Sequence, residues 1–126
     1  MKPIVLVVED DGDLREIVCE VLENAGCEAR PAASGEEALT VLGAAQHADL
    51  ILLDLTMPGM SGFELRERLL RAPELCGIPV VVMTASRGFD ASGLSPAGVL
   101  LKPLDVSQLL DMIDEVLPAS AARSAE

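Results

Sequence analysis

The run Ile4-Val5-Leu6-Val7-Val8, followed at once by Glu9-Asp10-Asp11-Gly12, decides the fold. Consecutive apolar residues that are mostly β-branched are typical of a central parallel strand covered on both faces. From Asp13 onward, apolar residues recur at helical spacing as far as Leu22. Gly26 lies where a left-handed residue would end that helix. The start of the chain therefore predicts a strand, an acidic loop and a helix, in that order.

The same alternation continues along the rest of the chain. Further strands are predicted at 27–33, 50–53, 80–83 and 99–101, and further helices at 34–45, 63–70 and 107–117. Pro31 would remove a hydrogen-bond donor from the second strand, which favours an edge position. Ser34 and Glu37 form a capping-box pattern, and Ser107 is expected to cap the last helix. Alternating strands and helices predict parallel units with right-handed crossovers, and hence a three-layer α/β sandwich.

Length and composition limit the range of possible functions. The chain has 126 residues, which is the size of one domain, expected over 1–118 with 119–126 as a disordered tail or linker stub. A formal charge of -12 argues against nucleic acid and anionic membranes as direct partners. The three cysteines lack the spacing of a disulfide framework or a zinc site, so they are expected to be small buried thiols in a reducing cytosol. No apolar run has the length of a signal-peptide core or membrane span, so a cytoplasmic protein is expected.

Polar side chains follow four of the five predicted strands. Glu9 and Asp10 follow the first strand, Asp54 the third, Thr84 the fourth and Lys102 the fifth. In a parallel sheet these residues converge on one edge, where ligands bind. Three carboxylates brought together repel unless a cation compensates them, and their oxygen ligands suit Mg²⁺. A carboxylate beside such a cation can attack phosphorus, while an ammonium and a hydroxyl satisfy the other phosphoryl oxygens.

Four segments, in this order and spacing, resemble the signature segments of response-regulator receiver domains of two-component signalling. They are Val-Val-Glu9-Asp10-Asp11, Leu-Leu-Asp54-Leu-Thr-Met-Pro-Gly-Met-Ser-Gly62, Val-Met-Thr84-Ala-Ser and Leu-Leu-Lys102-Pro103. The likeness extends over essentially the whole chain apart from its tail. It implies a flavodoxin-like, doubly wound (βα)5 fold with a parallel five-stranded sheet in the order 2-1-3-4-5.

The resemblance also implies which residues hold the metal and the phosphoryl group. Asp54 would be the phosphoacceptor. Asp10, Asp54 and the backbone carbonyl of Thr56 would bind Mg²⁺ directly, and Glu9 would act through water.

Two further residues and the partners follow from the same resemblance. Thr84 would hydrogen-bond the phosphoryl group, and Lys102 would pair with it and precede a cis bond to Pro103. A sensor histidine kinase or phosphotransfer protein would supply the phosphoryl group, and an unknown downstream protein would receive the signal. Such a domain is not a turnover enzyme, although it would catalyse its own phosphorylation and dephosphorylation.

The chain departs from the family's pattern in the segment that usually transmits the signal. Val99 stands where a tyrosine or phenylalanine usually lies, three residues before the lysine. The stretch from Thr84 to Lys102 is shorter than usual and contains Gly88, Gly93, Pro96 and Gly98, which predicts a degenerate fourth helix. We therefore expect no phosphorylation-driven dimer through the fourth helix, fifth strand and fifth helix, the surface that many receiver domains use. An alternative function is a receiver-like module that binds a partner without phosphorylation.

Overall fold

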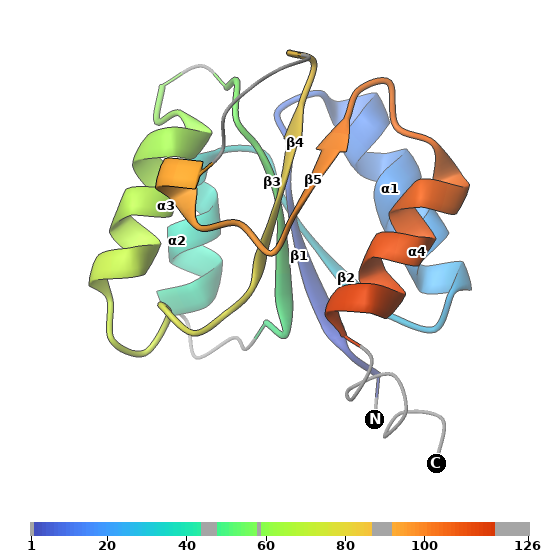
Figure 1. The fold of residues 1–126 in the computed structure, drawn as a ribbon, viewed down its shortest axis with the longest axis horizontal. Coiled ribbons are helices and arrows are strands. Elements are labelled where there is room, and N and C mark those ends of the chain that lie inside the picture. The colour runs from blue at the N-terminus through green and yellow to red at the C-terminus, as the bar shows by residue number, and fades with distance from the viewer. Residues whose placement is uncertain (1, 44–47, 58, 87–91, 118–126) are drawn as a thin grey trace.

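The computed structural model describes residues 2–43, 48–57, 59–86 and 92–117. Strands and helices alternate along the chain, as Figure 1 shows. The elements are β1 (Ile4–Val8), α1 (Gly12–Asn24), β2 (Glu28–Ala32), α2 (Gly35–Gly43), β3 (Leu50–Asp54), α3 (Gly62–Arg71), β4 (Val80–Thr84), the short 3-10 helix η1 (Ser92–Leu94), β5 (Gly98–Leu101) and α4 (Val106–Val116). All strand pairs are parallel and the order is β2-β1-β3-β4-β5, so the predicted fold class and strand order are confirmed.

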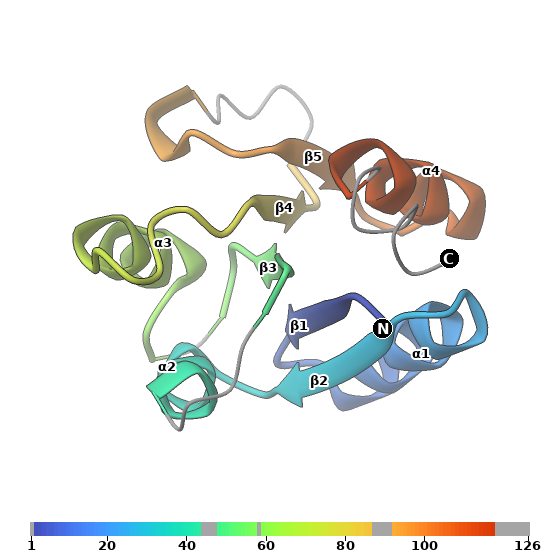
Figure 2. The ribbon, with the colours of Figure 1, turned by 90° about the horizontal axis from the view of Figure 1, so that it is seen from below.

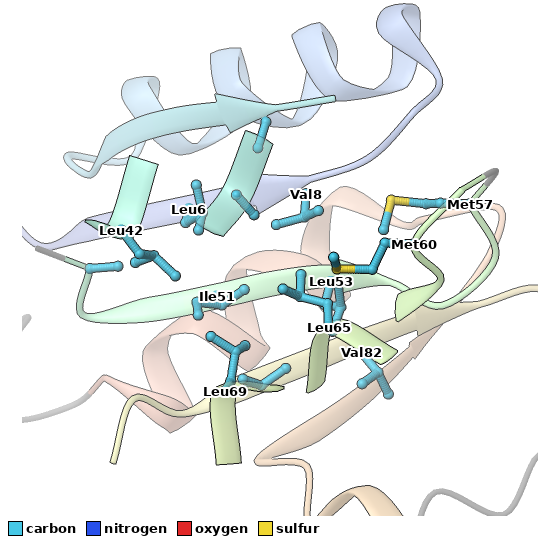
Figure 3. Packing of buried hydrophobic residues seen from close by; sticks show 14 of the residues in the cluster. Leu6, Val8, Leu42, Ile51, Leu53, Met57, Met60, Leu65, Leu69 and Val82 are labelled. Atoms are coloured by element: carbon cyan, nitrogen blue, oxygen red, sulfur yellow. The ribbon is translucent and has the colours of Figure 1, made fainter. Parts of the chain in front are cut away.

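The sheet lies between two layers of helices, with α2 and α3 on one face and α1 and α4 on the other (Figures 1 and 2). Every residue of β3 and β4 is buried, as expected for central strands covered on both faces. Side chains alternate between the two faces along each strand. Leu6, Ile51 and Val82 pack toward α2 and α3 (Figure 3), whereas Val7 and Leu52 pack toward α1 and α4.

The ends of the sheet and of the helices test the predictions made from single residues. β2 lies at one edge of the sheet, as Pro31 predicted. Half of the Ser34–Glu37 capping box is confirmed, because the Glu37 amide donates to Ser34 Oγ at 3.0 Å, whereas the Glu37 carboxylate accepts from the Ala33 amide. The prediction that Ser107 caps the last helix is wrong. Asp105 caps α4 instead and accepts from the Gln108 amide at 3.0 Å, so the helix begins before Ser107.

The connection between β4 and β5 contains only η1 among the described residues, which agrees with the predicted degenerate fourth helix; residues 87–91 lie outside the description. The buried guanidinium of Arg66, on α3, holds this connection. Its Nε donates to the Leu94 carbonyl at 2.8 Å and its Nη2 to the Ser95 carbonyl at 3.0 Å. Burial lowers the pKa of Arg66. Leu94 and Ser95 are thereby held against α3.

Three smaller expectations concern the tail, membranes and thiols. The predicted tail at 119–126 lies outside the described residues. Within the described ranges, no helix has both the length and the apolar character needed to cross a bilayer. Cys27 is buried and Cys19 partly so, but Cys76 is exposed, so the expectation of buried thiols is wrong for Cys76.

Gly62, the first residue of α3, packs directly against the end of β3. A Cβ at this position would lie 2.3 Å from the Asp54 carbonyl oxygen and 2.6 Å from Leu55 Cα. We expect Gly62→Ala to lower the free energy of unfolding by about 3 kcal/mol, because backbone atoms cannot yield as a flexible side chain can. Urea denaturation measures the change. Gly77→Ala is the control, since nothing lies within 4 Å of a Cβ there; an equal loss in both variants would contradict the prediction.

Candidate functional site

The parallel sheet brings the carboxyl ends of β1, β3, β4 and β5 to the same edge. The register pairs Val8 with Leu53, Asp54 with Met83, and Thr84 with Leu101. Polar residues that are far apart in the sequence therefore lie at neighbouring strand ends, as predicted.

Glu9, Asp10 and Asp54 form a cluster of three carboxylates. Each offers one oxygen, and these three atoms lie within 4.8 Å of one another. Glu9 and Asp54 are 1% and 2% exposed, whereas Asp10 is exposed. Glu9 and Asp54 are thus shielded from solvent, whereas Asp10 lies at the surface. This set of hard oxygen donors fits a small divalent cation such as Mg²⁺.

Lys102 extends from the end of β5 into this cluster. Its Nζ lies 2.8 Å from Glu9 Oε1 and 3.3 Å from Asp54 Oδ1. Its amide donates to the Thr84 carbonyl at 2.8 Å, and the bond to Pro103 is cis, as predicted. Burial opposes the charge on Lys102, but the two acids outweigh burial and raise the pKa of Lys102 above its usual value. The ammonium therefore compensates the two buried carboxylates but not Asp10.

The surroundings of Glu9 shift the pKa of its carboxyl group. Burial raises its pKa to about 7, and Asp54 adds to the rise, while Lys102 and the Asp11 amide oppose it. That amide donates to Glu9 Oε2 at 3.2 Å. Without a metal, the Glu9 carboxyl group therefore gains or loses its proton as the pH crosses neutrality.

The backbone around the cluster fixes the remaining predicted residues. The Thr56 amide donates to Asp54 Oδ1 at 3.2 Å, so the loop after β3 folds back on the Asp54 carboxylate. Thr84 is buried, and its Oγ1 accepts from the Ser86 amide at 3.1 Å. The roles of the Thr56 carbonyl as a metal ligand and of the Thr84 hydroxyl as a phosphoryl donor remain predictions.

One residue of the site was missed in the sequence. Arg15, on the first turn of α1, donates from Nη1 to the Glu9 carbonyl at 2.8 Å and so fixes the backbone of the acidic loop. No local sequence signal links Arg15 to Glu9, because the contact spans six residues and joins a helix to the loop before it. Asp11, the next residue of the acidic loop, caps α1 by accepting from the amides of Asp13 and Leu14.

The raised pKa of Glu9 predicts a pH dependence of stability. The folded chain keeps a proton on Glu9 that the unfolded chain releases above about pH 4.5, so unfolding becomes easier as the pH rises. The contribution of Glu9 to the free energy of unfolding should fall by at most roughly 3 kcal/mol between pH 4.5 and pH 7. Above pH 7 this contribution should change no further.

Urea denaturation at pH 5 and pH 8 in the presence of EDTA measures this loss. Glu9→Gln should remove most of it, and Glu16→Gln, at an exposed position on α1, should not. If Glu9→Gln shows the same pH dependence as the unaltered chain, the burial of an ionisable Glu9 does not govern stability in this range.

Comparisons with known proteins agree with this geometry. The family model described as the response regulator receiver domain matches residues 5–114. The chain is 31% identical to sporulation initiation phosphotransferase F of Bacillus subtilis, over 94% of this chain and 96% of that protein. It is 32% identical to the phosphate regulon transcriptional regulatory protein PhoB of Pseudomonas aeruginosa, over 97% of this chain but 55% of that protein, about half its length. Its structure resembles that of the Vibrio cholerae chemotaxis protein CheY4 with a TM-score of 0.86 and 29% identity, over 93% of this chain and 100% of that one.

Proposed function

The chain belongs to the response regulator receiver domain family, and on this premise we propose that it is a switch in which Asp54 accepts a phosphoryl group in a magnesium-dependent reaction. The observation that carries the proposal is the position of Asp54. Its buried carboxylate lies within reach of both Lys102 and the acid pair at the end of β1. A merely structural acid at the end of a strand would need neither a half-buried ammonium nor two further carboxylates beside it.

In the proposed reaction, a carboxylate oxygen of Asp54 attacks the phosphorus of the donor and forms an acyl phosphate. The bond from phosphorus to the donor breaks, and the leaving group departs with its electron pair. Lys102 is placed to exchange its ion pair with Asp54 for one with the phosphoryl oxygens, and Thr84 would donate from its hydroxyl. Asp10, Asp54 and the Thr56 carbonyl would hold Mg²⁺, with Glu9 acting through water, and the ion would offset charge between the attacking and phosphoryl oxygens.

The proposed partners are proteins. A sensor histidine kinase or a phosphotransfer protein would donate the phosphoryl group, and a downstream protein would recognise the phosphorylated state. The formal charge of -12 disfavours direct contact with nucleic acid and fits a cytoplasmic signalling protein. Because the acyl phosphate is the product that signals, the domain would work as a self-phosphorylating and self-dephosphorylating switch and not as a turnover enzyme.

Labelling with a small phosphodonor tests the proposal. Incubation with acetyl phosphate and Mg²⁺ should add one phosphoryl group to most chains, as measured by intact-protein mass spectrometry. The same incubation with excess EDTA is the control and should add almost none. If the chain stays unlabelled with Mg²⁺ while a known receiver domain is labelled in parallel, the proposal is overturned. The alternative, a receiver-like module that binds a partner without phosphorylation, would then be favoured.

A further inference from the structure

Arg15 lies in the first turn of α1, and its side chain reaches back to the loop that precedes the helix. Helical side chains lean toward the N-terminus of their helix, which allows this reach. The guanidinium lies over Gly12, where a Cβ would be 3.5 Å from Nη2. Its Nη1 donates to the Glu9 carbonyl at 2.8 Å. Arg15 therefore connects the start of α1 to the residue that follows β1.

Helix electrostatics do not account for a half-buried guanidinium at this position. The N-terminus of a helix carries partial positive charge, so it favours acids and disfavours cations. Asp13, in the same turn, has the favoured sign and Arg15 has the opposite one. None of the ion pairs among the described residues involves Arg15. The interaction that holds the guanidinium is therefore its hydrogen bond to the Glu9 carbonyl.

The Glu9 carbonyl belongs to the peptide bond that joins Glu9 to Asp10. Because a peptide unit is planar, fixing its carbonyl also fixes the direction in which the chain enters Asp10. The Glu9 amide is held as well, since it donates to the Ala32 carbonyl at 3.1 Å. The Asp10 carboxylate is exposed, and the ion pairs of Lys102 do not reach it. The place of this carboxylate in the acid cluster therefore depends on its backbone.

We propose that Arg15 is a positioning residue of the magnesium site, because its hydrogen bond to the Glu9–Asp10 peptide holds the Asp10 carboxylate in place for the ion. The inference rests on the magnesium site of the proposed function. Mg²⁺ demands near-ideal octahedral geometry, so it tolerates poorly a ligand whose backbone is free to rotate. Arg15 acts through the backbone and is not itself a ligand, as is common for groups that orient metal ligands.

The charge of Arg15 and its hydrogen bond predict opposite effects on the binding of Mg²⁺. A guanidinium near three carboxylates repels an incoming cation, so removing the charge alone would tighten binding. Removing the hydrogen bond frees the Glu9–Asp10 peptide and would weaken binding. The direction in which the affinity changes therefore separates a positioning role from a purely electrostatic one.

Arg15→Met removes the charge and the hydrogen-bond donors but keeps an unbranched side chain. We expect it to weaken Mg²⁺ binding by about tenfold, as measured at pH 8 by titrating MgCl₂ into ¹⁵N-labelled protein and following amide shifts. Arg15→Lys keeps a charge and a donor, so it should bind Mg²⁺ more tightly than Arg15→Met. Arg71→Met removes the same charge at an exposed position on α3 and should leave the affinity within about twofold. Urea denaturation first establishes that each variant is folded.

The hydrogen bond itself can be followed without any metal. A hydrogen bond to a carbonyl group moves the ¹³C resonance of its carbon downfield. In metal-free protein, Arg15→Met should therefore move the Glu9 carbonyl resonance upfield, and Arg71→Met should leave it in place. An unchanged Glu9 resonance in Arg15→Met would overturn the inference, because the contact would then be absent in solution.

The remaining outcomes distinguish this inference from the proposed function. Unchanged or tighter Mg²⁺ binding in Arg15→Met would overturn the inference, and so would an equal loss in Arg71→Met or binding in Arg15→Lys no tighter than in Arg15→Met. If the unaltered chain binds no Mg²⁺, both the inference and the proposed function fail. If it binds Mg²⁺ but is not labelled by acetyl phosphate, the proposed function fails and the role of Arg15 in the metal site stands.

Discussion

Asp54→Asn should abolish phosphoryl labelling by acetyl phosphate, and the phosphorylated species should fall below detection in the intact-protein mass spectrum. The amide that replaces the carboxylate has the same shape but no anionic oxygen, so it cannot form an acyl phosphate. Glu9, Asp10 and Lys102 remain in the variant, so the test isolates the attacking atom from its surroundings.

The control for this variant is Asp13→Asn, which makes the same chemical change at an exposed acid in the first turn of α1. It should be labelled like the unaltered chain. Circular dichroism of both variants establishes that they are folded before labelling is compared. If Asp54→Asn is labelled as fully as Asp13→Asn, the phosphoryl group resides elsewhere and the central claim about this site is refuted.

The sequence predicted the fold and the acid cluster because both depend on short-range patterns. β1, β3 and β4 are apolar runs that stop at polar residues, and parallel pairing then determines which polar residues meet. The missing backbone donor of Pro31 also indicated that the second strand lies at an edge of the sheet. These features need no knowledge of how side chains pack across the molecule.

What the sequence did not predict depends on contacts between distant residues. Lys102 was expected to pair with a phosphoryl group, but without one it bridges Glu9 and Asp54. Arg66 follows the polar pattern of a surface helix, yet it is buried and bonds carbonyls 28 and 29 residues away. The cap of α4 was misassigned because Asp105 and Ser107 are both good capping residues, and packing, not propensity, decides where the helix begins.

Asp10→Ala should weaken the binding of Mg²⁺ by at least about tenfold, as measured by isothermal titration calorimetry at pH 8, where Glu9 is largely ionised. Asp10 is the one exposed carboxylate of the cluster, and the ion pairs of Lys102 reach only the other two. It is therefore the ligand that a cation can reach without displacing a bound ammonium. Asp13→Ala removes an equal charge nearby and should leave the affinity within about twofold.

Lys102→Ala makes the opposite change in the same cluster. Removing the ammonium leaves Glu9 and Asp54 without their compensating charge, so the variant should bind Mg²⁺ at least as tightly as the unaltered chain. The two variants should therefore move the affinity in opposite directions, which a general loss of folding cannot do. Equal affinity in Asp10→Ala and the unaltered chain would show that the cation does not use this carboxylate. Weaker binding in Lys102→Ala would show that the ammonium organises the site and does not compete for it.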